Sequence, residues 1–550
     1  MPGTEISFRG ESTASLGTVE VIGSASGGHS GILSAHSDGL GVSYLPDSPF
    51  LPGEAVTVRA DVPLDGSVRG AVTFRVGVPG VPASTPTQRE IEQPSHEPQQ
   101  FRSRPDLLPP TVTITDSSPN LAPGYVVIGA KVTDGQNGAM IVDNRGEVVW
   151  FNPLPLDIAT QSDVRVQTYR GEAVITAWEG VSQLGTGFGH LVIYDQSYGE
   201  VLRRQVPNGY PGADQHEFLI TARDTALVII YNPLEWDLTS VGGPANGNAL
   251  DSVIQEIDLV TGHMLFEWHS LDHIAPAESY TVYAPEEPWD YVHFNSVELD
   301  EDDNFIVSAR NSHAIYKIER ESGRIRWRLH GKRSDFRMGP DAGFALQHDA
   351  RLHPDGTLSL FDNHEGDQAL EAEAQSRGMV LRLDEDLREA TLVREYVHPT
   401  EILSVSQGNM QTLPNGNVFV GWGSAPVFSE FSSDGQFLFN GRFPQGTNSY
   451  RAFRYEWEGQ PGEPPAVAVE AGLGDMLTIF VSWNGDTRTT AWRVLAGESA
   501  DDLDPIGTVM RSGFETEITV QSAASLVVLA AQDADGNELI RTDPIPVTTV

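Results

Sequence analysis

Three histidines occupy the same place in three consecutive repeats of this chain. His216, His293 and His348 each stand at the start of an alternating apolar segment that predicts the first strand of a hairpin: HEFLITARDTALVIIY, HFNSVELDEDDNFIVSAR and HDARLHPDGTLSLFDN. Arg310 closes the second strand of the hairpin that His293 opens. Neutral imidazoles and a permanent cation can together hold an anion and supply a nucleophile. The spacing therefore predicts an anion-handling site.

The elements that must position these residues are two recurrent hairpins. One is an acidic or polar turn followed by an aromatic-rich strand, and it recurs six times at intervals of 50 to 65 residues, from Asp143, Asp195, Asp258, Glu319, Asp384 and around Asp434. The other begins at Asp163, His216, His293, His348 and Gln407. The second hairpin, which supplies the inner strand of each unit, occurs only five times. We expect residues 450–457 to supply the sixth inner strand, paired with YVVIGAKV and AMIVDN near the start. Six such units without helices predict a six-bladed β-propeller closed by its two ends.

The propeller geometry gives a reason for convergence. The innermost strand of each blade lines the central channel, and the second strand runs antiparallel to it, so starts of first strands and ends of second strands share one channel mouth. The three histidines and Arg310 are thus expected at that mouth.

Seven further residues lie beside these positions. The aromatic ones could sandwich an aromatic ring or serve ordinary packing between blades, and the amides could hold substrate oxygens or satisfy turn backbone. They are Trp178, Tyr231, Trp422, Asn295, Asn363, Gln407 and Asn409.

Length and composition set the outer organisation. The 550 residues carry a formal net charge of −41 and no cysteine, which argues against nucleic acid and anionic membranes as partners and excludes disulfides and thiolate chemistry. The fold class is predicted to be all-β, with the propeller flanked by N-terminal and C-terminal β-sandwich domains. The boundaries are 1–85 (sandwich), 86–110 (Pro-rich linker or strap), 111–457 (propeller), 458–465 (linker) and 466–550 (immunoglobulin or fibronectin III-like sandwich).

The run from TDGQNGAMIVDNRGEVVWF through DYVHFNSVELDEDDNFIVSARNSH, LQHDARLHPDG and SQGNMQTLPNGNVFVGWG resembles the arylsulfotransferase family, which does not use the nucleotide sulfate donor. The resemblance covers residues 120–457 and is closest to the actinobacterial and fungal branch. It implies that His348 accepts the sulfuryl group, that His216 and His293 assist, and that Arg310 completes the set. It further implies an aryl sulfate donor, a phenol acceptor, a covalent sulfohistidine and no cofactor.

Two other readings stay open. Three histidines could bind Fe, Zn or Cu, although Arg310 beside a metal would be costly without a bridging anion. The other alternative is a propeller that binds a partner at the cell surface and has no catalytic activity.

The family resemblance implies a secreted or cell-envelope protein. The first thirty residues contain no signal peptide, which predicts a cytoplasmic protein if residue 1 is the natural N-terminus.

Overall fold

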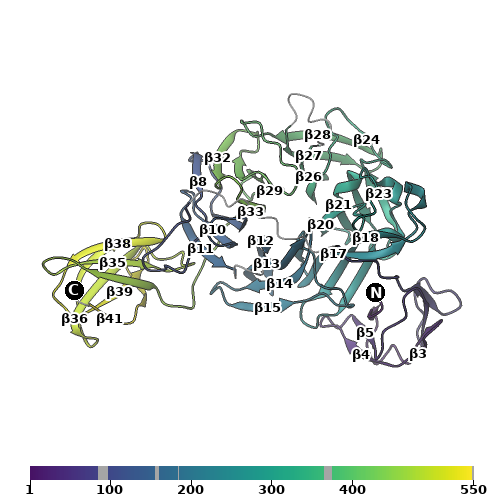
Figure 1. The fold of residues 1–550 in the computed structure, drawn as a ribbon, viewed down its shortest axis with the longest axis horizontal. Helices are drawn as coiled ribbons and strands as arrows, with labels where there is room; N and C mark the ends of the chain where they lie inside the picture. The colour runs from purple at the N-terminus through teal and green to yellow at the C-terminus, as the bar shows by residue number, and fades with distance from the viewer. Residues whose placement is uncertain (84–96, 155–159, 184, 365–374, 548–550) are drawn as a thin grey trace. The chain divides into compact units, whose positions relative to one another are not determined.

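The computed structural model describes residues 1–83, 97–154, 160–183, 185–364 and 375–547, and its regular structure is almost entirely β (Figure 1). The helical segments in these ranges are single 3-10 turns: η1 (Thr239–Val241), η2 (Ser270–Asp272), η3 (Pro276–Glu278) and η4 (Arg310–Ser312). The all-β prediction is confirmed. Among the described helices, none has the length and apolar character needed to cross a membrane.

The chain divides into two compact units. The first comprises Met1–Ile91, Trp178–Val192 and Arg203–Met410, and the second comprises Glu92–Ala177, Ile193–Leu202 and Gln411–Val550.

Six sheets occupy the span between Thr113 and Tyr455. Their strand orders are β33-β9-β10-β11, β12-β13-β14-β15, β16-β17-β18-β19, β20-β21-β22-β23, β25-β26-β27-β28-β24 and β29-β30-β31-β32-β8. The strands are β8 (Thr113–Ser117), β9 (Tyr125–Lys131), β10 (Gly138–Val142), β11 (Val148–Pro153), β12 (Thr160–Tyr169), β13 (Glu172–Gln183), β14 (Thr186–Tyr194), β15 (Glu200–Arg204), β16 (Phe218–Ile220), β17 (Thr225–Trp236), β18 (Gly247–Asp258), β19 (Met264–His269), β20 (Phe294–Leu299), β21 (Phe305–Ala309), β22 (Ala314–Ile318), β23 (Ile325–Leu329), β24 (Arg337–Met338), β25 (His348–Leu352), β26 (Thr357–Asp362), β27 (Arg377–Asp384), β28 (Glu389–Tyr396), β29 (Asn409–Thr412), β30 (Val418–Gly421), β31 (Val427–Phe431), β32 (Phe437–Arg442) and β33 (Asn448–Tyr455).

The first sheet joins two distant parts of the sequence. β33 pairs antiparallel with β9, with Tyr455 opposite Tyr125 and Asn448 opposite Lys131. β9 in turn pairs with β10, and β10 with β11. The pairing predicted for residues 450–457 with the early strands is therefore confirmed.

Two edge strands were not predicted. β8 pairs with the outer edge of β32, and the two-residue β24 lies parallel to β28. The segment before the repeats thus also contributes a strand to the last sheet.

The Pro-Asp-Gly sequence forms a tight turn between β25 and β26. The His353 amide donates to the Thr357 carbonyl at 2.7 Å, and Gly356 adopts a φ of 77°, which glycine tolerates because it has no Cβ. β25 and β26 are antiparallel, so His348 begins a strand as expected.

The two ends of the chain form further small sheets. The N-terminal strands pair as β1-β5-β4 and β3-β2-β6-β7, and side chains from both sheets share one hydrophobic cluster around Leu16, Val42 and Val56. They are β1 (Ile6–Arg9), β2 (Val19–Gly23), β3 (Gly27–His29), β4 (Gly31–Ala35), β5 (Gly41–Pro46), β6 (Ala55–Ala60) and β7 (Val72–Arg75).

The C-terminal strands pair as β34-β35-β38 and β37-β36-β39-β40, with β41 on β39, around a cluster that includes Ile479, Trp492 and Leu529. They are β34 (Ala466–Ala471), β35 (Met476–Ser482), β36 (Ala491–Ser499), β37 (Asp502–Met510), β38 (Glu515–Gln521), β39 (Leu526–Gln532), β40 (Glu538–Arg541) and β41 (Ile545–Pro546).

The expected linkers carry no strand where they are described. Residues 97–110 and 458–465 lie outside all strands and helices, whereas residues 84–96 of the Pro-rich segment fall outside the described ranges.

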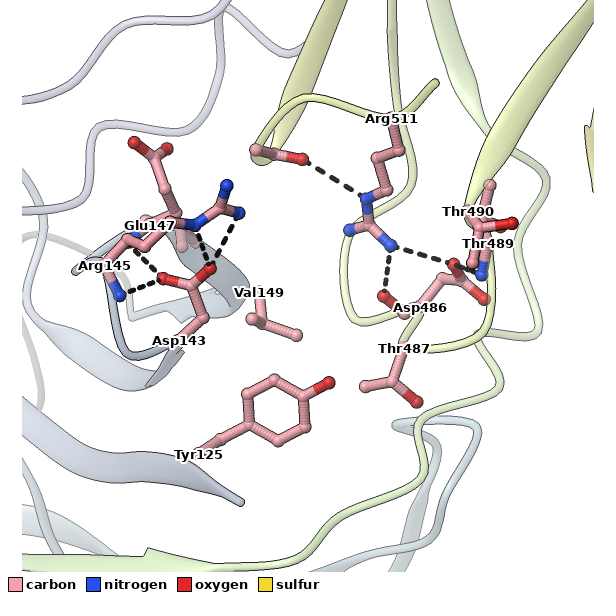
Figure 2. A pocket seen from close by; sticks show the side chains of 12 residues that line it. Tyr125, Asp143, Arg145, Glu147, Val149, Asp486, Thr487, Thr489, Thr490 and Arg511 are labelled. Atoms are coloured by element: carbon pink, nitrogen blue, oxygen red, sulfur yellow. Dashed lines mark hydrogen bonds and ion pairs between the residues drawn. The ribbon is translucent and has the colours of Figure 1, made fainter. Parts of the chain in front are cut away.

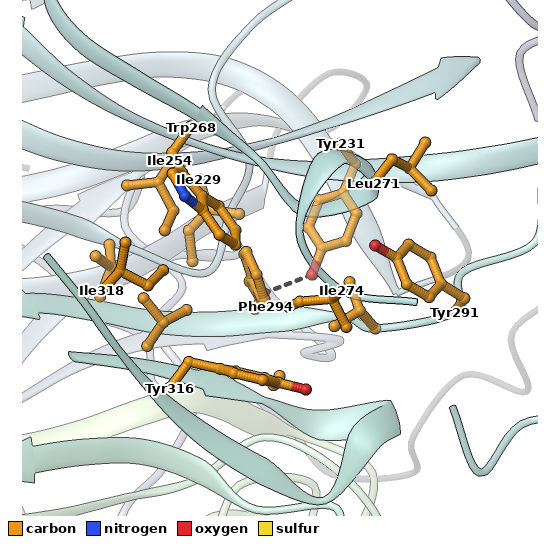
Figure 3. Packing of buried hydrophobic residues seen from close by; sticks show 14 of the residues in the cluster. Ile229, Tyr231, Ile254, Trp268, Leu271, Ile274, Tyr291, Phe294, Tyr316 and Ile318 are labelled. Atoms are coloured by element: carbon orange, nitrogen blue, oxygen red, sulfur yellow. Dashed lines mark hydrogen bonds between the residues drawn. The ribbon is translucent and has the colours of Figure 1, made fainter. Parts of the chain in front are cut away.

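The largest core cluster near the candidate residues packs β17 and β18 against β20 to β22 (Figure 3). Tyr231, Phe294 and Tyr316 are buried in it, and β17 supplies the β-branched run that suits a strand covered on both faces. This core fixes the strands beside which His216 and His293 stand.

Candidate active site

His216 lies two residues before β16 and is held by a carboxylate. Its ring is buried, and Nδ1 donates to Oδ1 of Asp214, whose same oxygen accepts the His216 backbone N–H at 3.0 Å. The second carboxylate oxygen of Asp214 accepts the Gly187 N–H at 2.5 Å. Because an ionised carboxylate only accepts, the His216 proton lies on Nδ1 in the neutral ring.

His293 lies directly before β20 and has the same kind of partner. Its Nδ1 donates to Oδ2 of Asp290, and its backbone adopts a left-handed φ of 55°. Burial lowers the pKa of His293, the Asp290 charge and hydrogen bond oppose this, and His216 and Arg310 lower the pKa further.

The rings of His216 and His293 contact each other. Their centroids are 4.8 Å apart with planes at 84°, an edge-to-face arrangement. The Tyr231 ring packs 5.9 Å from His216 and 5.5 Å from His293. Its hydroxyl donates to the Phe294 carbonyl at 2.5 Å, the dashed contact in Figure 3, so this hydroxyl is committed to the backbone.

His348 differs because an amide, not a carboxylate, orients it. The Asn363 Nδ2 donates to the carbonyls of Ser404 and Gln407, each at 2.9 Å, which turns Oδ1 toward His348. Nδ1 of His348 therefore donates to Asn363 Oδ1 at 2.7 Å and to the Leu346 carbonyl at 3.0 Å. Nε2 is left with its lone pair, which accepts the Gln407 N–H at 3.2 Å.

The electrostatics keep His348 neutral. Its side chain is buried, and this desolvation lowers its pKa well below the ordinary value, with further lowering by Arg310, His216 and His293. The Asn363 hydrogen bond opposes the shift. An unprotonated imidazole near neutral pH is the form that can act as a nucleophile.

Arg310 opens the turn η4 directly after β21. Its backbone N–H donates to the His293 carbonyl at 2.8 Å, and its guanidinium donates to Asn311 Oδ1 at 2.9 Å and to the Val405 carbonyl at 3.1 Å. Both guanidinium partners are neutral, and within the described residues Arg310 forms no ion pair. This cation lowers the pKa of both His293 and His348, and all four predicted residues belong to the first unit.

Three of the four predicted amides, Asn295, Asn363 and Gln407, lie beside His348. Asn295 Nδ2 donates to the Gln347 carbonyl at 2.7 Å, and Asn363 holds the ring itself, so both bind backbone carbonyls beside the nucleophile candidate. Gln407 contacts His348 through its backbone N–H, and Asn409 is buried at the start of β29.

The two tryptophans are not available as a surface for a ring. Trp178 and Trp422 are both fully buried, and their indole N–H groups donate to the Ala213 carbonyl at 2.8 Å and to Ser429 Oγ at 3.0 Å. This burial favours the packing alternative for both.

Sequence reasoning missed Asp214, Asp290 and the orienting role of Asn363. The signal was present for the first two, because each acid precedes its histidine by two or three residues, in DQH and DYVH, whereas LQH lacks one. His313, which follows η4 with a φ of 48°, is buried against the Tyr280 ring, 4.1 Å away.

A cavity of about 310 Å³ lies in the second unit, apart from these residues (Figure 2). Its walls carry the ion pairs of Arg145 with Asp143 and of Arg511 with Asp486, and Tyr125 lines it as well. None of the predicted site residues lines this cavity.

A family model described as arylsulfotransferase (ASST) matches residues 165–444, just over half of the chain. The chain belongs to the arylsulfotransferase family. The resemblance read from the sequence is thereby confirmed, and the branch within the arylsulfotransferases stays a prediction. No curated protein matches significantly.

Solved structures resemble this arylsulfotransferase family member only distantly. A protein of unknown function from Bacteroides caccae is 14% identical with a TM-score of 0.36, covering 58% of this chain and 93% of that chain. A catalytically inactive virginiamycin B lyase from Staphylococcus aureus with quinupristin is 11% identical with a TM-score of 0.28, covering 69% and 94%. The GH43 protein BlXynB from Bacillus licheniformis is 8% identical with a TM-score of 0.29, covering 70% and 89%. Likenesses at this level carry no argument about activity.

Proposed function

We propose that this protein transfers a sulfuryl group from an aryl sulfate to a phenol through a covalent intermediate on His348. The observation that carries the proposal is the division of partners among the histidines. Asp214 and Asp290 back two rings with carboxylates, whereas Asn363 backs the third with an amide. A carboxylate stabilises a protonated imidazole more strongly than a neutral amide does, so we assign proton transfer to the first two histidines and nucleophilic attack to the third.

In the first half-reaction, Nε2 of His348 attacks sulfur and the bond from sulfur to the aryl oxygen breaks. Attack places positive charge on the imidazole ring. The Nδ1–H stabilises this charge because it donates hydrogen bonds to two carbonyl oxygens, those of Asn363 and Leu346. The substrate displaces the long hydrogen bond from the Gln407 N–H before attack. His216 or His293, in its protonated form, gives the proton on Nε2 to the departing phenolate and keeps the Nδ1–H bonded to its aspartate. The conjugate acid of the phenolate has a pKa of about 10.

In the second half-reaction, a new phenol gives its proton to the His216 or His293 ring that protonated the leaving group, and the phenol oxygen attacks sulfur. The bond from Nε2 to sulfur then breaks and returns the electron pair to His348. Donor and acceptor use the site in turn, so the kinetics are ping-pong.

Arg310 would stabilise the charge that gathers on the sulfuryl oxygens. Its guanidinium is partly buried, which lowers its pKa, yet its neutral partners leave the positive charge uncompensated by any ion pair in the described residues. A preorganised cation of this kind stabilises a transition state more than a solvated one.

The proposed scaffold is a six-bladed propeller with a β-sandwich at each end. Support comes from six consecutive sheets of four or five strands, from the β33 pairing that would close a ring, and from the two-sheet clusters at each terminus. The alternative of a metal site finds no support, because within the described ranges no cluster of three or more potential metal-ligating side chains is placed to hold an ion.

The test is release of nitrophenol from p-nitrophenyl sulfate, with and without added phenol. We expect phenol to accelerate release in the wild-type protein, a sulfated histidine peptide to be trapped at His348, and His348→Asn to lower turnover by more than about 1,000-fold because the nucleophile is lost.

The control is His353→Asn, in the same hairpin, where Nε2 contacts Ser359 Oγ at 2.9 Å. It should retain activity. Sulfotransfer through His348 is wrong if His348→Asn keeps wild-type turnover or if phenol has no effect on the wild type.

A further inference from the structure

The residue directly after His348 has an unusual backbone. Asp349 adopts a φ of 55°, in the left-handed region that non-glycine residues rarely occupy, although Asp and Asn tolerate it best. Across this position the pairing of β25 with β26 shifts: His348 lies opposite Phe361 and Arg351 opposite Ser359. Three steps on one strand therefore match two on the other, which defines a β-bulge. A bulge reverses the alternation of side chains and re-aims its neighbour, here His348.

Both oxygens of the Asp349 carboxylate hold this bulge. Oδ1 accepts from Arg351, at 3.0 Å from Nε and 2.6 Å from Nη2, and Oδ2 accepts the Met410 backbone N–H at 3.3 Å. Asp349 is almost fully buried, so these bonds lie largely out of water.

Arg351 extends the hold to the other histidines. Its Nη2 also donates at 2.8 Å to Glu217, the residue after His216, and the same Glu217 oxygen accepts the Val297 N–H of β20 at 3.1 Å. β20 is the strand that follows His293. One guanidinium therefore connects the backbone segments that carry all three histidines.

We propose that Asp349 and Arg351 are positioning residues that hold the bulge and thereby aim the His348 Nε2 lone pair. This inference rests on the proposed function, because it assigns the aim of the nucleophile. Neither side chain needs to touch the substrate.

The deciding variants are Asp349→Ala and Asp349→Asn. Asparagine tolerates a left-handed φ but keeps only one accepting oxygen, so its amide N–H would face either Arg351 or the Met410 N–H. Asp349→Asn should therefore lower kcat less than Asp349→Ala does, by under about 10-fold. Alanine keeps neither property, and Asp349→Ala should lower kcat by about 10- to 100-fold with KM for the donor changed less than about 3-fold, because misplacement of an attacking group affects the chemical step.

Arg351→Lys is the second variant in case Asp349→Ala does not fold, since it leaves the Asp349 backbone unchanged and keeps a positive charge beside the buried Asp349 and Glu217 while losing the two-nitrogen contact with Asp349. We expect it to lower kcat by about 10-fold at unchanged KM.

Asp341 provides the matched control, because it has the same φ of 55° on an exposed turn. Asp341→Ala measures only the cost of placing alanine at a left-handed φ. It should lower Tm and leave kcat at the wild-type value.

A readout that does not depend on sulfotransfer is the rate at which diethyl pyrocarbonate acylates His348, followed by mass spectrometry. The rate should rise at least about 3-fold in Asp349→Ala, as the ring leaves the Gln407 N–H, and stay unchanged in Asp341→Ala. If the wild type fails to transfer sulfate but this difference persists, only the proposed function fails. Unchanged His348 acylation and unchanged kcat in Asp349→Ala, with Tm lowered as in Asp341→Ala, would overturn the positioning role.

Discussion

At the scale of residues, the partners of the three histidines support the proposed separation of proton transfer from nucleophilic attack. His216 and His293 each donate Nδ1–H to an aspartate, and His348 donates to Asn363. The Asp290 carboxylate raises the pKa of His293 against the effect of burial, whereas burial and Arg310 both lower the pKa of His348. The different roles that we propose for these chemically similar side chains thus follow from their immediate neighbours.

This division predicts a dependence on the leaving group. Asp214→Asn and Asp290→Asn remove the charge that stabilises a protonated ring, and the variant that affects the acid should lose about 100-fold in kcat/KM with phenyl sulfate. With p-nitrophenyl sulfate the loss should be under about 10-fold, because nitrophenolate needs little protonation. Steady-state kinetics on a series of substituted aryl sulfates measure this dependence as the slope of log(kcat/KM) against the pKa of the departing phenol, here called the leaving-group slope.

The control for this prediction is Asp251→Asn, which alters the separate pair of Asp251 with His269, 2.5 Å apart. It should leave the leaving-group slope unchanged. An unchanged slope in both Asp214→Asn and Asp290→Asn would contradict the assignment of the acid.

At the scale of elements, buried charge connects β33 to a neighbouring sheet. Arg454 on β33 and Glu430 on β31 are both fully buried, with Nε and Oε2 2.7 Å apart. Arg454 also donates to the Gly124 carbonyl at 3.2 Å and to Asn144 Oδ1 at 2.6 Å. Removing one partner of such a pair leaves the other charge buried without compensation.

We therefore expect Arg454→Met to lower the free energy of unfolding by about 3–5 kcal/mol, measured by urea denaturation. The double variant Arg454→Met/Glu430→Gln should recover part of this loss, since the uncompensated charge is then absent. Arg541→Ala, which breaks the exposed pair with Glu538, should change stability by less than about 1 kcal/mol. A similar small effect for Arg454→Met would argue against a stabilising role of the buried pair.

The elements were more predictable than the contacts that orient the site. Alternation, turn residues and the repeat period sufficed for the strands, for the pairing of β33 with β9 and for the placement of three histidines at strand starts. The Asn363 contact could not be predicted, because it depends on a side chain fifteen residues away whose amide is turned by two loop carbonyls. The edge strands β8 and β24 were missed because each is short and has no alternation that separates it from a loop.

At the scale of the whole molecule, buried histidines connect stability to pH. Burial lowers the pKa of both His36 and His313 to about 4, with Arg9 and His330 respectively adding to the shift. The unfolded chain, with an ordinary histidine pKa of about 6.5, binds more protons than the native state between these values. Stability from these groups is thus present above about pH 6.5 and lost as the pH falls toward 4.

Each such histidine should add a slope of about 1.4 kcal/mol per pH unit within this window. Urea denaturation at fixed ionic strength between pH 4.5 and 7 measures the slope, and His36→Gln/His313→Gln should flatten it relative to wild type. His353→Gln should flatten the slope in the same direction, because burial lowers the pKa of this ring as well. An equal slope in wild type and double variant would contradict the assigned protonation states.

The pairing of β33 with β9 also bears on how the chain is made. Tyr125 and its partner Tyr455 are 330 residues apart, so at about 5–20 residues per second the ribosome needs on the order of 15 to 65 s to deliver the missing strand. During that interval β9 presents an unpaired edge with the apolar sequence YVVIGAK, which can recruit strands of other chains. Nascent chains are therefore most exposed to misassembly before residue 455 emerges, and chaperones that cover strand edges would act in that window.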